Sequence, residues 1–193
     1  EIGLIIGAGN IFRGIQAASK GMDRVTGDYL GMLATIMNAI SVQDALEKVN
    51  CETRTLSAIN ITQIAEPYIR RRAIRHLEKG RIIIISGGTG NPFFTTDSAA
   101  ALRAKELGAE IVIKGTKVDG IYDKDPVEFS DAVKYNKISF SEVLEKNLRV
   151  MDLTAITLCK ENDLPINVFN INNPGDLKEL ILEAKIGTFV IKE

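Results

Sequence analysis

The feature that most constrains this chain is a strand-like run, a glycine-rich turn and a helix-like segment that follow one another over residues 81–107. The run from Arg81 to Ile85 is continuous and β-branched, which is typical of a strand buried in a parallel sheet. Residues 98–107 are rich in alanine and leucine and end at Gly108, a common residue after a helix. A glycine-rich turn between a strand and a helix N-terminus favours anion binding, because free backbone N–H groups and the helix dipole both attract negative charge.

The turn itself carries polar side chains that are suited to a small ligand. Its hydroxyl and amide groups can hydrogen-bond a base or a sugar, and they belong to Thr89, Asn91, Thr95 and Thr96. Asp97 follows at the helix entrance, where it can cap the helix or take part in chemistry. The alternative is that the glycines only turn the chain. The chain contains no G-x-x-x-x-G-K-[ST] and the turn does not match G-x-G-x-x-G, which excludes a P-loop and a dinucleotide fingerprint.

Charge and composition exclude several classes of protein. The chain has 193 residues, of which 45% are hydrophobic and 25% charged, and this is ordinary for a globular domain with a sizeable core. A formal net charge of -1 gives no bulk attraction to nucleic acid or to an anionic membrane. No apolar run reaches the length of a membrane span and no signal peptide is visible, so we expect a cytoplasmic protein.

The cysteines predict neither a disulfide nor a metal site. Cys51 and Cys159 lie far apart in the sequence and lack the spacing of paired ligands. We interpret them as two buried thiols in a reducing compartment. Together with the lone His76 they provide too few ligands for a recognisable zinc site, so no metal ligands are assigned to the chain.

A second glycine-rich turn follows the first strand-like run. Residues 2–6 predict a strand, and residues 7–14 form the turn Gly-Ala-Gly-Asn-Ile-Phe-Arg-Gly. In open α/β sheets ligands bind beyond the C-terminal ends of the strands, so the two turns are predicted to face one cleft. Arg13 can grip a phosphate there, unless it is only a surface arginine. Because the chain opens inside a strand-like run and without Met, we also expect an upstream segment that is absent from this sequence.

The remaining pattern alternates helices and strands. It predicts a helix, or two abutting ones, over Asp23–Val49 that includes Asp28, a carboxylate that is either solvated or bound to a ribose. Pro67 is predicted to open a helix that Gly80 closes, with Ile69, Ala73 and Leu77 buried. A capping box at Ser139–Glu142 predicts another helix start. Further helices are expected from Asp152 or Thr154 to Glu161 and from Pro174 to Ala184, and strands over 54–59, 110–114, 165–170 and 188–191.

This alternation predicts an α/β fold in which a mainly parallel central sheet is sandwiched between helices. We expect residues 1–193 to form a single domain. The helix after Pro67 carries a basic cluster that is either a solvated face or a contact for an anionic effector or a subunit; its members are Arg70, Arg71, Arg72, Arg75 and Lys79.

The polar loop over residues 115–126 is a second candidate for ligand binding. Its three aspartates do not match the spacing of an EF-hand, so calcium is not expected. Thr116, Tyr122 and Asp125 can instead frame a nucleotide base and ribose, since loop residues often carry function.

At the level of motifs the chain resembles the bacterial uridylate (UMP) kinases. The resemblance covers essentially the whole chain and rests most specifically on Gly-Thr-Gly-Asn-Pro-Phe-Phe-Thr-Thr-Asp-Ser-Ala-Ala at 88–100. Other matching segments are Gly-x-Gly-Asn-x-Phe-Arg-Gly at 7–14, Gly-Asp-x-x-Gly-Met-Leu-Ala-Thr at 27–35, Lys-x-Thr-Lys-Val-Asp-Gly-x-Tyr at 114–122, Val-Met-Asp-Leu-Thr-Ala at 150–155 and Phe-Asn-x-Asn-x-Pro-Gly at 169–175. It implies an amino-acid kinase fold and the reaction ATP + UMP → ADP + UDP with Mg²⁺.

The resemblance also implies roles for individual residues. Asp97 and Arg13 would be catalytic, and the backbone of Ala8 and Gly9 would contact phosphate. Asp28 would bind the UMP ribose. The acceptor phosphate and uracil would be held by Thr89, Gly90, Asn91, Pro92, Phe93, Phe94, Thr95 and Thr96, and ATP by Gly9, Arg13, Thr116, Tyr122 and Asp125. It further implies a homohexamer that GTP activates and UTP inhibits, although Gln43 and Glu47 stand where some members have basic residues.

The chain departs from the family pattern at two points. The first strand and the Lys-x-Ser-Gly-Glu phosphate loop of the family are missing from this chain, and we expect them in the upstream segment. Ala8 replaces a residue that is often glycine, which is tolerable if the backbone has negative φ. Carbamate, acetylglutamate and aspartate kinases lack the uracil-type motif, and a non-catalytic nucleotide-binding protein remains the alternative of another class.

Overall fold

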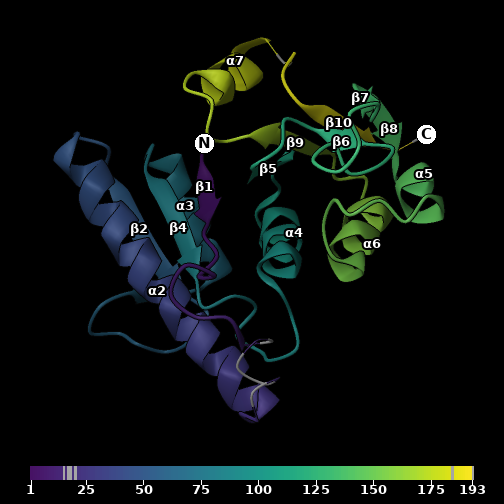
Figure 1. Cartoon of the computed structure of the whole chain (residues 1–193). Helices are drawn as coiled ribbons and strands as arrows, with labels where there is room; N and C mark the ends of the chain where they lie inside the picture. Colours follow the sequence, from purple (N-terminus) through teal and green to yellow (C-terminus); the bar gives the residue numbers. More distant parts are fainter. Residues whose placement is uncertain (15, 17–18, 20, 184, 193) are drawn as a thin grey trace. The chain divides into compact units, whose positions relative to one another are not determined.

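The computed structural model describes all residues except 15, 17–18, 20, 184 and 193, and it divides into two compact units, Glu1–Leu107 and Gly108–Glu193 (Figure 1). Five of the seven strand pairings among the described residues are parallel. The predicted α/β class with mainly parallel pairing is therefore confirmed.

The first unit is built on a fully parallel four-stranded sheet. Its strand order is β1 (Gly3–Ile5), β4 (Ile82–Ser86), β2 (Thr53–Ser57) and β3 (Glu66–Pro67). The register pairs Ile5 with Ile85 and Leu56 with Ile85, so the C-terminal ends of β1, β4 and β2 lie at one edge. Since ligands bind at that edge of parallel sheets, both glycine-rich turns are placed where binding is expected.

Helices cover this sheet because the isoleucines of β4 are buried on both faces. Ile83 and Ile85 form a core cluster with Leu56 and with Ala73 and Leu77 of α3 (Arg70–Glu78). Ile84 points to the opposite face and is also fully buried, and α2 (Arg24–Lys48) packs against β2 and β4. The helix α4 (Thr96–Leu107) packs against β1 and α3.

The second unit has a mixed four-stranded sheet and a short hairpin. Its order is β5 (Val112–Thr116), β9 (Ile166–Asn170), β10 (Thr188–Ile191) and β8 (Lys137–Ser139), and only β9–β10 is antiparallel in this sheet. The hairpin joins β6 (Ile121–Tyr122) to β7 (Lys134–Tyr135). The described residues of this unit also form the helices α5 (Phe140–Glu145), α6 (Leu153–Glu161) and α7 (Asp176–Glu183).

Several helix boundaries follow the predicted chemistry. Asp23 caps α2 by accepting the Thr26 N–H, and the helix is single and unbroken. The capping box between Ser139 and Glu142 is present in full at the start of α5, and Asp152 caps α6. These ends were predictable because a cap is a contact between residues three apart in the sequence.

Other sequence predictions were wrong. Pro67 does not open α3; it ends the edge strand β3, where its missing N–H costs no ladder bond, and Tyr68 N–H then donates to Ser57 O. Ile69 is therefore the extended residue before the helix and is half exposed rather than buried. Strand 54–59 ends at Ser57, since the Ala58 N–H turns to Ser86 O.

The basic cluster on α3 is largely paired with neighbouring groups. Arg70 donates to the backbone oxygen of Glu106, and Arg72 lies 3.6 Å from the Glu66 carboxylate. Arg75 lies 3.4 Å from Glu78 within the helix. These contacts favour the solvated, structural face over an effector contact. No helix in the described part of the chain has both the length and the apolar character needed to cross a membrane.

The cysteines differ in burial, which corrects the expectation of two buried thiols. Both are free, but Cys51 is half-buried whereas Cys159 is fully buried in α6. Burial raises the pKa of the Cys159 thiol to about 11. Only the thiolate reacts readily, so Cys159 is protected both by its surroundings and by its protonation.

We predict that iodoacetamide at pH 8 alkylates Cys51 well before Cys159, as followed by peptide mass spectrometry over time. The control is the protein in concentrated urea, where both thiols should react at similar rates. Equal rates in the folded protein would contradict the burial of Cys159.

Candidate active site

The two glycine-rich turns lie side by side at the C-terminal edge of the first sheet. Gly7 follows β1 and Gly87 follows β4, and these strands are hydrogen-bonded neighbours. A Cβ placed on Gly7 would lie 3.5 Å from the Thr96 hydroxyl oxygen, so the first turn also contacts the start of α4. The strand order thus brings together the two segments that the sequence singled out.

The second turn has an unusual backbone. Positive φ angles occur at Gly87 (75°), Gly88 (58°) and Gly90 (84°), and also at Phe93 (71°). At Gly87 a Cβ would lie 3.1 Å from the backbone nitrogens of both Ala58 and Ile59. The positive φ and the lack of space for a side chain therefore both require glycine at this position. Phe93 has no such freedom, and a bulky residue in this region is strained unless its surroundings hold it.

Side chains on one face of α2 hold both turns. The Thr35 hydroxyl accepts the Gly87 N–H at 2.8 Å and itself donates to Met32 O at 2.6 Å. Asn38 donates to Gly7 O at 2.8 Å. Asp28 accepts the Phe93 N–H at 2.8 Å. Spacings of seven and three residues place these three side chains on the same face of a helix.

Asp28 is a buried anchor rather than a solvated acid. Its side chain is 11% exposed, and both carboxylate oxygens lie 2.9 Å from Arg24 Nε. The Arg24 guanidinium lies 5.8 Å from the centre of the Phe93 ring and so extends the contact to the turn. A Cβ on Gly14 would lie 2.7 Å from Asp28 Oδ1, which means that the first turn can reach Asp28 only because it ends in glycine.

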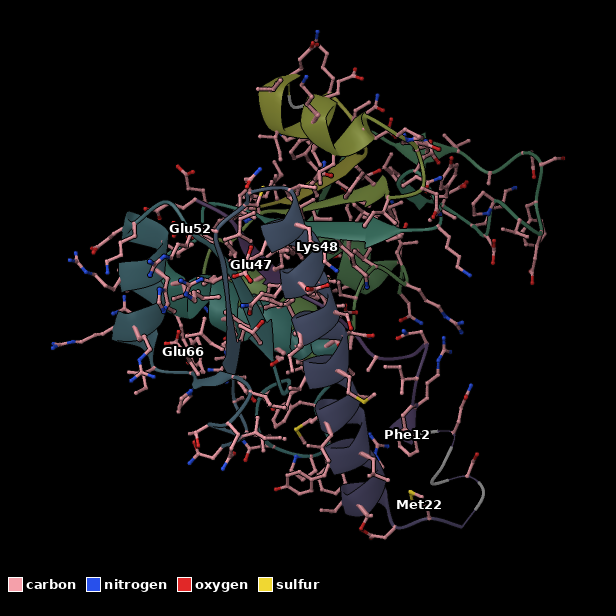
Figure 2. The ribbon with its side chains drawn as sticks, turned by 90° about the vertical axis from the view of Figure 1, so that its left-hand side faces the viewer. Phe12, Met22, Glu47, Lys48, Glu52 and Glu66 are labelled. Atoms are coloured by element: carbon pink, nitrogen blue, oxygen red, sulfur yellow. The ribbon has the colours of Figure 1, made fainter. Side chains whose placement is uncertain are left out.

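The first turn is held by its own backbone and by Asn10. Ala8 is buried, and its oxygen accepts the N–H groups of Ile11 and Phe12 at 2.9 Å. Its φ is not positive, so the extra methyl group is tolerated as expected. Asn10 and Asn38 exchange amide hydrogen bonds of 3.2 and 2.8 Å. Figure 2 shows Phe12 and Met22 near the N-terminal part of α2, away from Glu47 and Lys48 at its other end.

Arg13 is exposed and folds back onto its own turn. Its Nε donates to Gly9 O at 3.0 Å, and a Cβ on Gly9 would lie 2.9 Å from that nitrogen. This arrangement places the guanidinium beside the backbone of the first turn. An anion bound there would contact both the guanidinium and the backbone of the turn.

The start of α4 completes the edge. Thr95 caps the helix, because its hydroxyl accepts the Ser98 N–H at 3.2 Å and its carbonyl accepts the Ala99 N–H at 3.1 Å. The capping role that the sequence allowed for Asp97 thus falls to Thr95, and Asp97 lies half-buried in the first helical turn. Within the loop Thr89 and Asn91 are joined locally, while Phe93 and Phe94 are 65% and 50% exposed. Gly90 and Pro92 complete this loop.

Of the five residues predicted to bind ATP, Thr116, Tyr122 and Asp125 lie in the second unit. Thr116 ends β5, and its hydroxyl donates to Val118 O and accepts the Val118 N–H, closing a tight turn. Tyr122 lies in β6, and its hydroxyl donates to Asp119 at 2.6 Å. Asp125 accepts the Val127 N–H at 2.8 Å.

The acidic loop of this unit is held by hydrogen bonds between its own residues. Asp119 receives hydrogen bonds from Tyr122 and from Lys134 Nζ at 2.9 Å. Burial alone would raise the pKa of the Asp119 carboxyl, but these two donors hold it below its ordinary value. Asp123 accepts the Val133 N–H at 2.8 Å, which fixes the hairpin.

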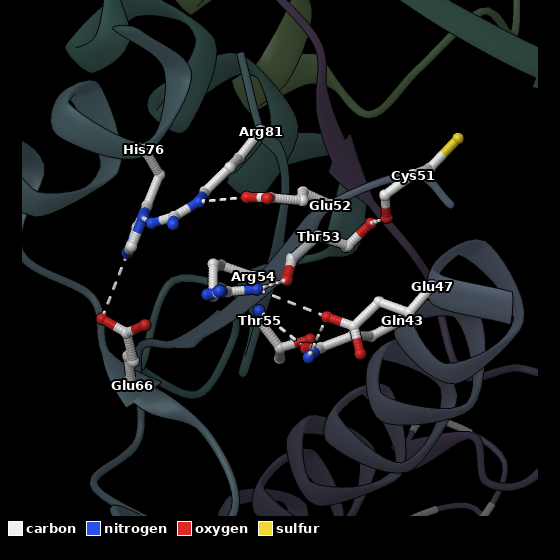
Figure 3. A network of polar contacts seen from close by, with 10 residues as sticks. All are labelled: Gln43, Glu47, Cys51, Glu52, Thr53, Arg54, Thr55, Glu66, His76 and Arg81. Atoms are coloured by element: carbon white, nitrogen blue, oxygen red, sulfur yellow. Dashed lines mark hydrogen bonds and ion pairs between the residues drawn. The ribbon is translucent and has the colours of Figure 1, made fainter. Parts of the chain in front are cut away.

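A separate ionic network lies at the opposite edge of the first sheet, near the starts of β2 and β4 (Figure 3). Arg81 contacts Glu52 at 2.9 Å and donates to His76 Nδ1 at 3.1 Å, which leaves His76 Nε2–H to face Glu66 at 3.2 Å. Gln43 accepts the Thr55 N–H at 3.0 Å. A hollow of about 200 Å³ adjoins this network and is lined by Gln43, Arg54, Thr55, Thr62, Ile64, Ala65 and Glu66.

Comparison with known proteins decides the family. The model of the amino acid kinase family matches residues 1–170. The chain belongs to this family. The chain is 38% identical in sequence to a UMP kinase from Bacillus anthracis whose crystal structure is known. The TM-score is 0.96, and the match covers 100% of this chain and 80% of that one.

Two further solved structures agree. A UMP kinase from Ureaplasma parvum is 40% identical with a TM-score of 0.93, over 98% of this chain and 81% of that one. A uridylate kinase from Archaeoglobus fulgidus is 26% identical with a TM-score of 0.75, over 98% of this chain and 84% of that one. The resemblance in sequence motifs to the bacterial UMP kinases is therefore confirmed at the level of whole structures.

Sequence reasoning did not identify several side chains that shape the site. Thr35 was noted only as the last residue of the 27–35 motif and Asn38 only as part of a helix, and Arg24 and Arg103 were not singled out. The sequence did contain a signal for them. Arg24, Thr35 and Asn38 are spaced from Asp28 as residues on one face of a helix, and Arg103 lies on the helix that follows the glycine-rich turn. Helical periodicity identifies which residues share a face, but it does not say what that face contacts.

We predict that Gly87→Ala lowers the free energy of unfolding by about 2–3 kcal/mol, because both positive φ and close backbone atoms oppose a Cβ. Gly80→Ala is the matched control: its φ is 73°, but open space surrounds the added methyl group. It should cost only about 1 kcal/mol. Urea titration of both variants measures the difference, and equal costs would contradict the crowding at Gly87.

We also predict a pH-dependent role for Asp119. Its pKa is lower in the folded chain, so its contacts stabilise the fold above its ordinary value of 3.8 and this contribution disappears as the pH falls through the folded pKa. The gap in unfolding free energy between wild type and Asp119→Asn should be widest above pH 5 and shrink toward pH 3.5, in urea titrations. Asp131→Asn, whose residue is 77% exposed, serves as control and should show almost no gap.

Proposed function

We propose that this member of the amino acid kinase family transfers the γ-phosphoryl group of Mg–ATP to UMP, giving ADP and UDP, in pyrimidine nucleotide synthesis. The observation that carries the proposal is the edge at which two glycine-rich turns meet the N-terminus of α4. Its likeness to UMP kinases at 38% and 40% identity supports the choice of UMP as acceptor.

The acceptor nucleotide is proposed to bind in the first unit. Backbone groups of Ala8 and Gly9 and the guanidinium of Arg13 would hold phosphate oxygens, and residues 89–96 would hold uracil and the acceptor phosphate. Asp28 would accept a ribose hydroxyl. Two carboxylate oxygens offer about four acceptor directions, so its contacts with Arg24 and Phe93 leave capacity for a hydroxyl donor.

The chemistry asks for alignment more than for a base. An oxygen of the UMP phosphate forms the new bond to the γ-phosphorus, the bond from that phosphorus to the β-phosphate oxygen breaks, and ADP leaves. A phosphate oxygen is already an adequate nucleophile, so catalysis depends on positioning and on compensating negative charge. We assign Asp97, in the first turn of α4, and Arg13 as the catalytic side chains.

Mg²⁺ is proposed to enter with ATP. The described residues contain no group of three or more His, Cys, Asp or Glu side chains that could hold a metal ion. In kinases Mg²⁺ usually keeps several water ligands and is bound by the phosphates of the substrate together with one or two carboxylates. The ion would neutralise charge on the transferred phosphoryl group.

The donor nucleotide is proposed to contact Thr116, Tyr122 and Asp125 in the second unit. The ordered loop around Tyr122 supports this assignment, because its hydrogen bonds to Asp119 and the hairpin keep its side chains in place. Preorganised loops lose less entropy when a ligand binds.

Assembly, regulation and location complete the proposal. A homohexamer that GTP activates and UTP inhibits, working in the cytoplasm, is what the resemblance supports. Exposed apolar side chains at four-residue steps along α2 add a surface for subunit contact, namely those of Tyr29, Leu33 and Met37. No effector site is assigned.

The test is a coupled ADP-release assay on the purified full-length protein with Mg–ATP as donor and UMP, CMP or dUMP as acceptor. We expect rapid turnover with UMP and little with CMP. Asp97→Asn should lower kcat by at least about 100-fold while UMP binding, measured by calorimetry, is retained. Asp44→Asn, an exposed control on α2, should leave kcat unchanged.

Two results would contradict parts of this proposal. Tight nucleotide binding without turnover on any acceptor would indicate a non-catalytic binding protein. Full activity of Asp97→Asn would remove Asp97 from the catalytic group while leaving the reaction itself in place.

A further inference from the structure

A buried arginine lies behind the glycine-rich loop and has no part in the chemistry proposed above. Arg103 is on α4 and is 7% exposed. Its Nη2 donates to Thr89 O at 3.2 Å, and its Nη1 lies 2.8 Å from Glu106 Oε2. The guanidinium also stacks on the Tyr68 ring at 4.1 Å.

The partners of Arg103 are themselves held in place. The Tyr68 hydroxyl donates to Glu106 Oε2 at 2.7 Å, and Arg70 donates to the Glu106 backbone oxygen. Burial alone would raise the pKa of the Glu106 carboxyl, but hydrogen bonds from Arg103 and Tyr68 keep it below its ordinary value. Glu106 is therefore a stable anion that orients the guanidinium.

Burial of this arginine is costly, which indicates that its position matters. Arg103 Nε is buried and has no hydrogen-bond partner. A buried charge destabilises a fold unless it is well paired, and an unsatisfied N–H adds to the cost. A hydrophobic residue would fill the space at lower cost, but it would provide no donor for the Thr89 carbonyl.

The Thr89 contact completes the support of the loop. Thr35 holds Gly87 and Asp28 holds Phe93, both from α2. Arg103 holds Thr89, which lies between those two points in the sequence, from α4. The loop has positive φ at Gly88 and Gly90 on either side of Thr89, and glycines bend easily when nothing restrains them.

We propose that Arg103 is a positioning residue for UMP: its grip on the Thr89 carbonyl fixes the 87–93 loop in the conformation that binds the acceptor nucleotide. This inference rests on the proposed function. It assigns Arg103 no contact with substrate, and it predicts that loss of the guanidinium weakens UMP binding while ATP binding stays unchanged.

The test compares Arg103→Met and Arg103→Lys with wild type in the ADP-release assay, measuring the KM of each substrate and kcat. Arg103→Met should raise the KM for UMP about tenfold, the effect of losing a hydrogen bond from a charged donor. The KM for ATP should stay within about twofold. The KM for UMP of Arg103→Lys should lie between those of wild type and Arg103→Met, since a single ammonium cannot contact Thr89 and Glu106 and also stack on Tyr68.

Arg75→Met is the matched control, because it removes an exposed arginine of the same unit whose partner is a helix neighbour. It should change neither KM. An unchanged KM for UMP in Arg103→Met, or equal rises in both KM values, would overturn the positioning role. Wild type without UMP turnover would instead refute the proposed function, and UMP titration calorimetry on the same variants would then decide the role of Arg103.

If Arg103→Met does not fold, Glu106→Gln decides the question. This variant keeps Arg103 and the shape of its partner but removes the charge that orients it. We expect the KM for UMP to rise about threefold with no change for ATP, since a charged acceptor becomes neutral. An unchanged KM for UMP in a folded Glu106→Gln protein would overturn the proposal.

Discussion

The backbone of the 87–93 loop is the constraint on which the first unit depends. Gly87, Gly88, Gly90 and Phe93 all have positive φ angles, a conformation that is strained at Phe93 unless the surroundings hold it. The loop persists because a hydroxyl, a carboxylate and a guanidinium hold it at separate points. The surrounding helices can be understood as the scaffold for these side chains.

The two edges of the first sheet are specialised in different ways. At the C-terminal edge, side chains of α2 and α4 hold the backbone of the glycine-rich loop: Thr35 accepts the Gly87 N–H, and Arg103 donates to the Thr89 carbonyl. At the N-terminal edge, charged side chains pair with one another, as in the contact of Arg81 with Glu52 and with His76 (Figure 3). A parallel sheet produces this division because all its strand ends of one kind lie together.

Charges near the loop serve mainly to hold the backbone in place. Asp28 and Arg103 are both largely buried, and both contact main-chain groups of the loop. This suits phosphoryl transfer, in which the reacting groups need alignment and charge compensation rather than a strong protein base. Rigid support for a flexible glycine loop is then as important as the groups that touch the substrate.

Local sequence was sufficient for the α/β class, the capping box at Ser139, the start of α2 after Asp23 and the location of both glycine-rich turns. These features depend on residues close together in the chain, so spacing and residue type reveal them. Motif resemblance added the family, which the comparisons confirmed. Pro67 was misread because its role depends on pairing with β2, a contact between segments that are distant in sequence.

Tertiary structure alone decided which side chains meet. It showed that the Asp28 carboxylate accepts the Phe93 N–H and that Arg103 of α4 donates to the Thr89 carbonyl. These contacts join residues up to 65 positions apart, as between Phe93 and Asp28. The sequence by itself determined where the chain can turn and bind; only the packing of α2 and α4 on the sheet determined which groups hold those turns, because helical spacing identifies a face but not its partner.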